Sequence, residues 1–183
     1  MLLNIFSNGR YDDVVLVMVG STRNEEDRDL VRSLEAEATF LGIVDHVSFV
    51  VNAPFSVLYG WLGEAQIGLH TMWNEHFGIS IVEMMAAGLV TVAHKSGGPL
   101  MDLIEPAAAS SSLSPLESHP LGSSSSTGYL ATTAVEYASC IGAALDTYQQ
   151  SLPLRQRARV ASLKFSDEAF GAAVVVLFSS FLN

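Results

Sequence analysis

The amino-acid sequence predicts an α/β fold, with a parallel sheet flanked by helices and a helical segment at the C-terminal end. Short β-branched apolar runs alternate four times with segments of helical periodicity, and only short links separate them. This alternation is typical of parallel strands joined by helical crossovers. The 183 residues are enough for one well-buried domain or for half of a larger enzyme, and we predict a single domain over residues 1–183.

The predicted strands are short apolar runs, each followed by a polar residue. The first, Asp-Val-Val-Leu-Val-Met-Val-Gly at residues 13–20, is nearly continuous in β-branched side chains, as expected for a strand buried on both faces. The other three strands are predicted at residues 47–51, 67–70 and 89–94. Ligands of such sheets bind at the carboxyl ends of the strands, so the residues that follow each run are candidates for a site.

The predicted helices place apolar residues at helical spacing. Residues 24–40 carry Leu30, Leu34 and Ala38 on one stripe, and the acidic residues of the first turn suit the helix dipole. Three more helices are predicted at residues 54–64, 78–87 and 99–104. The last of these begins at Pro99, a residue type that is favoured at the first helical position.

Residues 106–127 interrupt the alternation. This stretch is rich in Ser, Ala, Pro and Gly, and it cannot bury enough apolar surface to offset the entropy of ordering it. We therefore predict a disordered surface insertion, followed by a short strand or turn at residues 128–131. Three helices are predicted at residues 133–149, 153–163 and 167–181, the last with Ser166 as its N-cap. The apolar run at 170–182 is too short to cross a bilayer as a helix, so we expect a packed helix rather than membrane contact.

Charge and cysteine content exclude several function classes. The net charge of −10 argues against binding to nucleic acid and against adhesion to anionic lipid. The chain has two lysines, Lys95 and Lys164, so a diphosphate ligand would depend on backbone N–H groups, helix N-termini and a few arginines. Cys140 is the one cysteine, which excludes a disulfide framework, and residues 1–8 lack the basic flank of a signal peptide.

The most informative segment lies between two carboxylates eight residues apart, Glu75 and Glu83. They flank a Phe77-Gly78 turn that opens a predicted helix, where free N–H groups and the helix dipole favour a phosphate group. A carboxylate accepts two hydroxyl hydrogen bonds at once, as a ribose diol or a hexose requires. The alternative is that Glu83 is a solvated helix residue and that Glu75 is a simple charge at the N-terminal end of the helix. Gly78 favours the ligand, because a glycine lets it approach the backbone.

A second glycine turn, Ser96-Gly97-Gly98-Pro99, directly follows a predicted strand. Paired glycines allow a ligand to come close to the backbone, although a plain strand-to-helix turn is an equally open alternative. We expect the adjacent Lys95 to be exposed rather than to contact a phosphate group.

Three histidines, His70, His76 and His94, fit no standard metal-ligand spacing, so we predict no metal site. His70 and His94 end strands, where a hydrogen-bonded core or rim histidine is the usual role. Residues 78–82 lack the second glycine of a nucleophile elbow, which argues against a serine hydrolase. The absence of a G-x-G-x-x-G motif and of a Walker loop from the sequence argues against a dehydrogenase and an NTPase.

The segment from Glu75 to Glu83 resembles the Glu-x7-Glu motif of retaining GT-B glycosyltransferases of family 4. The wider pattern is similar to the eukaryotic α-1,2-mannosyltransferases of asparagine-linked glycosylation. It comprises residues 68–79, 93–94 and 96–99 and Asp102, with further likeness at residues 23–24, 51–55, 127–131 and 159–167. This resemblance implies a Rossmann-like fold that forms the C-terminal, donor-binding half of a GT-B enzyme.

The resemblance also implies roles for single residues. Glu75 would be the catalytic residue that faces the transferred mannose, and Glu83 would bind the ribose of GDP. The other implied donor-binding residues are Phe77, Gly78 and Ile79 at the diphosphate and sugar, Val51, Asn52 and Ala53 around the guanine, and His76, Gly97 and Gly98 beside them. Such enzymes use GDP-mannose as the donor substrate, with no metal in the donor site and no other cofactor.

The implied reaction is retaining transfer of mannose, in α-1,2 linkage, from GDP-mannose to a dolichol-pyrophosphate-linked oligosaccharide on the cytosolic face of the endoplasmic reticulum membrane. The acceptor-binding N-terminal domain and its membrane anchor have no counterpart in the sequence, so that domain is expected in cis or in trans. The chain itself is expected to be soluble, without a transmembrane segment or a nucleic-acid partner. The Arg-x4-Lys pair that neutralises the diphosphate in the family is missing, because Arg10 and Arg23 lie elsewhere. We therefore expect weak binding and no activity from the chain alone.

Two alternative functions stay open at this point. A non-catalytic nucleotide-sugar-binding or scaffold module would bind GDP without turnover. A family 4 transferase with another donor would prefer UDP-sugars or ADP-glucose to GDP-mannose.

Overall fold

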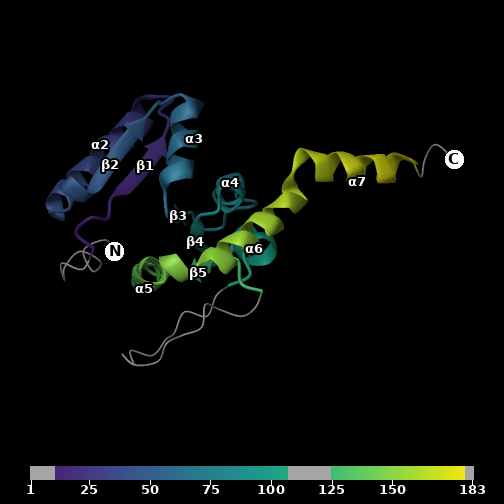
Figure 1. Cartoon of the computed structure of the whole chain (residues 1–183). Coiled ribbons are helices and arrows are strands. Elements are labelled where there is room, and N and C mark those ends of the chain that lie inside the picture. Colours follow the sequence, from purple (N-terminus) through teal and green to yellow (C-terminus); the bar gives the residue numbers. More distant parts are fainter. Residues whose placement is uncertain (1–10, 107–124, 180–183) are drawn as a thin grey trace. The chain divides into compact units, whose positions relative to one another are not determined.

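The computed structural model describes residues 11–106 and 125–179 (Figure 1). The chain divides into two compact units, Met1–Glu64 and Ala65–Asn183. Each unit contains its own parallel sheet. A single domain over residues 1–183 remains a prediction.

The first unit is built on a two-stranded sheet. Its elements in chain order are β1 (Leu16–Gly20), α2 (Glu25–Phe40), η1 (Val44–His46), β2 (Val47–Val51) and α3 (Phe55–Glu64). β1 and β2 pair in parallel, with Leu16 opposite Val47. α2 begins after Asn24, whose side chain accepts a hydrogen bond from the Asp27 N–H at 2.8 Å. Because β1 and β2 run in parallel, both strands end at the same edge of the sheet.

The second unit is built on a three-stranded parallel sheet in the order β3-β4-β5. Its elements are β3 (Ile67–His70), α4 (Ile79–Ala87), β4 (Val90–His94), η2 (Pro99–Leu103), β5 (Tyr129–Ala131), α5 (Ala134–Asp146), η3 (Tyr148–Gln150), α6 (Leu152–Ser162), η4 (Leu163–Phe165) and α7 (Asp167–Ser179). β4 lies in the centre of the sheet, and all five of its residues are buried. A central, fully buried strand gives the residues that follow it a rigid support.

The core of the second unit packs α4 against α6 and against the sheet. Buried side chains of α4, β4 and α6 and of the turn between β4 and β5 form one cluster: Ile81, Met85, Ala93, Leu103, Ile104 and Ala158. Ile81 and Met85 are fully buried and lie four residues apart, hence on one face of α4. These contacts hold α4 in place and so fix the position of its first residues.

The predicted strands and helices are present, with shifted boundaries. The first strand begins at Leu16 rather than at residue 13, because a turn precedes it in which the Val14 N–H donates to the Tyr11 carbonyl at 3.0 Å. The helix predicted at residues 133–149 ends at Asp146, and the separate turn η3 follows. The strands form two hydrogen-bonded sheets, whereas the sequence predicted one.

The predicted disordered insertion at 106–127 falls mostly outside the described residues, which omit 107–124. Its two flanks belong to the fold. Pro106 forms a parallel bridge with Gly128, and the Thr127 N–H donates to the Glu105 carbonyl at 2.8 Å. Ser126 and Thr127 are buried, so the predicted boundaries were too wide at both ends.

The last helix, α7, differs from the expectation of a packed helix (Figure 1). Within the described part of the chain it packs chiefly against η4, and none of its residues is buried. Five of its large apolar side chains are 58–71% exposed: Phe170, Val175, Val176, Leu177 and Phe178. The helix itself was predicted correctly, but the prediction that it is packed is wrong.

Candidate functional site at the start of α4

The first turn of α4 presents unpaired backbone N–H groups. Gly78 is the N-cap, with φ +97°, and its carbonyl accepts the N–H groups of Ile81 at 2.9 Å and Val82 at 3.2 Å. The N–H groups of Ile79 and Ser80 precede these donors and have no partner among the described residues. Together with the positive end of the helix dipole, they form a place where a phosphate group is favoured.

Gly78 is required here for two reasons. Its positive φ is strained for other residue types, and a Cβ would lie 2.9 Å from the Cδ1 of buried Ile81. The glycine thus lets the chain turn sharply from the Glu75 loop into α4, as the sequence predicted.

Glu75 lies in the loop just before this turn and is held by three contacts. Its Oε1 accepts the Phe77 N–H at 3.3 Å, and its Oε2 lies 3.6 Å from Nε2 of His70. Its backbone carbonyl accepts the N–H of Gly98 at 2.8 Å. The side chain remains 24% exposed, so the carboxylate can still meet a ligand.

His70 ends β3 and is the neighbour of Glu75 that the sequence did not predict. Burial lowers the pKa of His70, while the negative charge of Glu75 acts in the opposite direction. Its Nδ1 is buried and has no hydrogen-bond partner in the part of the chain that the structure describes. Its backbone carbonyl accepts the hydroxyl of Tyr137 on α5 at 3.0 Å, and burial raises the pKa of Tyr137 to about 12. The phenol is therefore a neutral donor that anchors the end of β3.

Gly97 and Gly98 lie directly against the Glu75 loop. Gly97 has φ +52°, and a Cβ on it would overlap the Glu75 carbonyl oxygen. A Cβ on Gly98 would lie 2.5 Å from the carbonyl oxygen of His76 and 2.6 Å from that of Phe77. The paired glycines therefore allow one backbone to pack on another. The sequence left open both close approach of a ligand and a plain strand-to-helix turn, and contact of Gly97 and Gly98 with a ligand stays a prediction.

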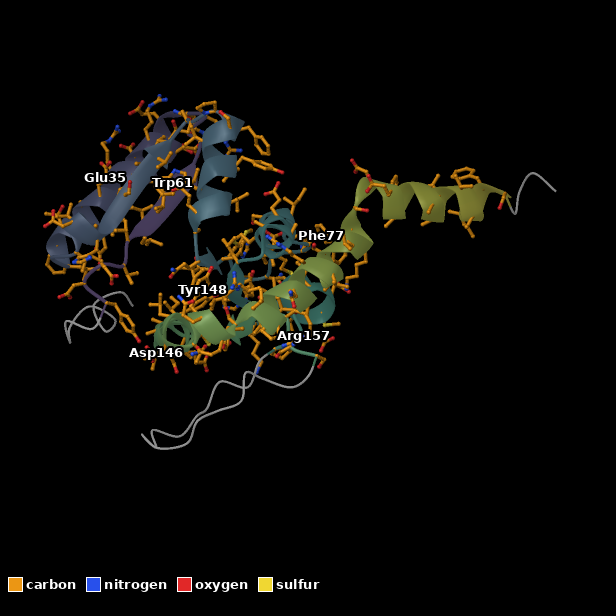
Figure 2. All side chains as sticks on the ribbon, viewed as in Figure 1. Glu35, Trp61, Phe77, Asp146, Tyr148 and Arg157 are labelled. Atoms are coloured by element: carbon orange, nitrogen blue, oxygen red, sulfur yellow. The ribbon has the colours of Figure 1, made fainter. Side chains whose placement is uncertain are left out.

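The remaining predicted residues of this unit surround the turn. His76, Phe77 and Ile79 are exposed. Glu83 is half-buried in the second turn of α4, and its side chain makes no hydrogen bond or ion pair to any described residue. The Phe77 ring meets the Phe165 ring of η4 edge-on, with the two ring centroids 5.1 Å apart. Phe77 is labelled in Figure 2. Both predicted carboxylates thus have oxygens free to accept hydrogen bonds from a sugar.

The predicted guanine pocket lies in the first unit, where residues 51–53 follow β2. Asn52 has φ +56°, its Oδ1 accepts the Thr22 N–H at 2.8 Å, and its Nδ2 donates to the Thr22 hydroxyl at 2.9 Å. The turn is thus tied to the carboxyl end of β1. That this turn binds a guanine stays a prediction.

Neither a metal cluster nor a membrane-spanning helix occurs in the described parts of the chain. No group of three or more His, Cys, Asp or Glu side chains is arranged to hold a metal ion there. Helices of the length and hydropathy needed to cross a bilayer are likewise missing from those parts.

Comparison with known sequences gives a consistent family. Residues 2–111 match the profile of the family described as glycosyl transferases group 1. The chain is 40% identical over 156 residues to a human protein named GDP-Man:Man(3)GlcNAc(2)-PP-Dol alpha-1,2-mannosyltransferase, and 44% identical over 158 residues to the Xenopus tropicalis protein of that name. These alignments cover 85% and 86% of this chain but 29% of each relative, so the chain spans less than a third of their length.

Solved structures show the same architecture. Anabaena Alr3699/HepE in complex with UDP has a TM-score of 0.71 and 25% identity, over 92% of this chain and 42% of that chain. Sucrose-phosphate synthase from Thermosynechococcus elongatus has a TM-score of 0.72 and 21% identity, over 91% of this chain and 38% of that one, and supports the fold alone. These likenesses confirm the predicted fold class, a Rossmann-like parallel α/β fold.

Proposed function

The chain belongs to the glycosyl transferases group 1 family, and from this premise we propose that it forms the donor-binding part of a GDP-mannose-dependent α-1,2-mannosyltransferase. The acceptor would be a dolichol-pyrophosphate-linked oligosaccharide, and the transfer would retain the anomeric configuration. The observation that carries the proposal is the pair of N–H groups at the start of α4, which have no partner among the described residues, beside the partly exposed Glu75. The printed name of relatives 40% and 44% identical supports the choice of donor and acceptor.

In the proposed complex, the diphosphate of the donor lies at the Ile79 and Ser80 N–H groups. As the bond to mannose breaks, negative charge grows on the departing GDP, and these fixed donors and the helix dipole stabilise it. Glu75 faces the mannose, and Glu83 accepts hydrogen bonds from the ribose hydroxyls. We propose neither a metal ion nor a further cofactor at this site.

The proposal also covers the acceptor substrate and the place of the reaction in the cell. The printed name of the relatives contains PP-Dol, which supports a dolichol-pyrophosphate-linked acceptor. We further propose, from the family resemblance alone, that the transfer takes place on the cytosolic face of the endoplasmic reticulum membrane. Since the chain spans 29% of these relatives, we propose that the acceptor is bound by a further domain, in cis or in trans.

Calorimetric titration with GDP-mannose, UDP-glucose and ADP-glucose tests the donor. We expect GDP-mannose to bind most tightly. Glu83→Gln removes the charged acceptor for the ribose, so its affinity for GDP should fall about tenfold. Glu35→Gln, on α2, is the matched control and should bind as the wild type does. Tighter binding of UDP-glucose or ADP-glucose would favour a family 4 transferase with another donor.

Transfer of mannose to a lipid-linked trimannosyl acceptor tests the reaction with the same chain. Binding of GDP-mannose without transfer would support the non-catalytic module for the chain alone. Activity restored by adding an acceptor domain would support the donor-binding half of an enzyme.

A further inference from the structure

The hydroxyl of Ser96 joins two segments that are distant in the sequence. It accepts the backbone N–H of Asn74 at 2.8 Å, and it lies 2.8 Å from Nδ1 of His94. A serine hydroxyl has one hydrogen and two lone pairs, so it can serve both neighbours at once. Ser96 therefore links the end of β4 to the residue that precedes Glu75.

His94 gives this link a rigid base. It is the last residue of β4, the central strand, and only 8% of it is exposed. A buried ring on a fully buried strand has little freedom to move, because its neighbours occupy the space around it. The position of Ser96 is thus set by the sheet rather than by the loop.

Asn74 transmits this position to Glu75. It has φ +56°, a left-handed conformation that asparagine tolerates better than most residues. Its N–H donates to the hydroxyl of Ser96. The carbonyl of the following residue, Glu75, accepts the Gly98 N–H at 2.8 Å. The peptide segment that carries the Glu75 side chain is therefore held at both ends.

The side chain of Glu75 has weaker support of its own. Its hydrogen bond to the Phe77 N–H is long, at 3.3 Å, and its distance to His70 is 3.6 Å. The backbone bonds therefore have the larger part in setting where the carboxylate points.

We propose, resting on the function proposed above, that Ser96 is a positioning residue for Glu75 and that His94 acts through Ser96. The His94–Ser96–Asn74 relay holds the carboxylate toward the sugar of a nucleotide-sugar donor. The relay therefore affects how tightly the sugar of the donor is bound. It does not affect binding of the nucleotide, which the start of α4 binds separately.

The test compares the affinities of GDP-mannose and GDP, measured by calorimetry on the full chain. Ser96→Ala should weaken GDP-mannose binding about fivefold, as expected for one lost hydrogen bond, and leave GDP within about twofold. Ser96→Thr keeps the hydroxyl and should bind both ligands as the wild type does. Ser139→Ala, an exposed serine on α5, is the matched control and should change neither affinity.

Variants of His94 separate the relay from general packing. His94→Asn keeps a polar atom near the place of Nδ1, whereas His94→Gln moves it toward the place of Nε2. We expect the asparagine variant to keep the wild-type ratio of the two affinities and the glutamine variant to lose it. Equal behaviour of the two would overturn the role of His94.

Nuclear magnetic resonance tests the relay without a ligand. In Ser96→Ala the Asn74 amide should exchange with solvent faster, and the carboxyl carbon of Glu75 should shift, while Ser139→Ala leaves both unchanged. Wild-type affinities and exchange in Ser96→Ala, or an equal loss in Ser96→Thr, would overturn the proposal. If the wild type binds no GDP-mannose, the proposed function fails, and these two signals still decide the relay.

Discussion

At the scale of single residues, Gly98 shows how closely the two turns of the site are packed. A methyl group there would lie 2.5 and 2.6 Å from two carbonyl oxygens of the preceding loop, and φ at Gly98 is −56°, so the conflict is one of space alone. Gly98→Ala should lower the free energy of unfolding by about 1–3 kcal/mol, the usual cost of overpacking. Chemical denaturation followed by circular dichroism measures it.

The control for this prediction is Gly171→Ala in α7, where a new Cβ would meet no atom within 4 Å. Alanine is the better helix former, so this variant should be unchanged or stabilised by up to about 1 kcal/mol. An equal loss of stability in both variants would contradict a local clash at Gly98.

The ion-pair geometry at His70 leads to a pH dependence. Because burial lowers the pKa of His70 in the folded state, the folded chain favours the neutral ring. The stability that depends on this neutral form is present at high pH and is lost as the pH falls through the lowered pKa of the folded state. Glu75→Gln removes the charge that opposes the shift, so the pKa should fall further.

A proton magnetic resonance titration of the His70 ring measures this pKa in both chains. Glu35→Gln, on α2, should leave the titration unchanged. A pKa that rises in Glu75→Gln would contradict the pairing of His70 with Glu75.

The sequence pattern singled out Glu75, Gly97 and Gly98, and the structure brings these three residues together, but their roles toward a ligand stay predictions. The sequence did not predict the pairing of Glu75 with His70, or the bond from Asn74 to Ser96, 22 residues away. Such contacts depend on which strand ends lie side by side, and periodicity does not contain that information. The one available hint was that both His70 and His94 end predicted strands beside the two glycine turns.

At the scale of elements, α4 is fixed at its C-terminal end by a side chain from α6. Arg159 donates through Nε to the Ala86 carbonyl at 3.2 Å and through a terminal nitrogen to the Ala87 carbonyl at 2.7 Å. A cation at this end also complements the helix dipole. Since Arg159 is exposed, Arg159→Ala should cost only about 1 kcal/mol of unfolding free energy.

Gln156→Ala, also exposed on α6, is the matched control and should change stability by less than about 0.5 kcal/mol. Hydrogen exchange at residues 86–88 should be faster in Arg159→Ala only. Unchanged exchange there would contradict the role of Arg159 as a cap.

Periodicity predicted the existence and type of the elements well, since apolar spacing differs between strands and helices. It predicted their ends less well. The start of β1 depends on the turn closed by Val14 and Tyr11, and the end of α5 on the change to η3. The grouping of strands into two sheets reflects hydrogen bonds between distant segments, which no single window of sequence contains.

At the scale of the whole molecule, burial is unevenly distributed. β4 is completely buried, whereas none of the residues of α7 is. Hydrogen exchange followed by mass spectrometry should find the slowest amides in β4 and fast exchange throughout α7, because a helix with little tertiary packing opens easily. Protection of α7 equal to that of β4 would contradict this, and protection that grows with protein concentration would indicate that copies of the chain cover its apolar face.

The sequence predicted the helix at α7 but could not predict its exposure. Thirteen mostly apolar residues favour burial on composition alone, and whether a partner surface exists is a property of the assembled molecule.

The contact between the glycine pair and the Glu75 loop has a practical consequence for protein engineering. In a chimera of two related transferases, residues 74–78 and 94–99 are best taken from the same parent, because their backbones pack directly against each other. A crossover placed between the two segments would pair a loop from one parent with a glycine turn from the other. A crossover placed before residue 67 would keep both segments from one parent.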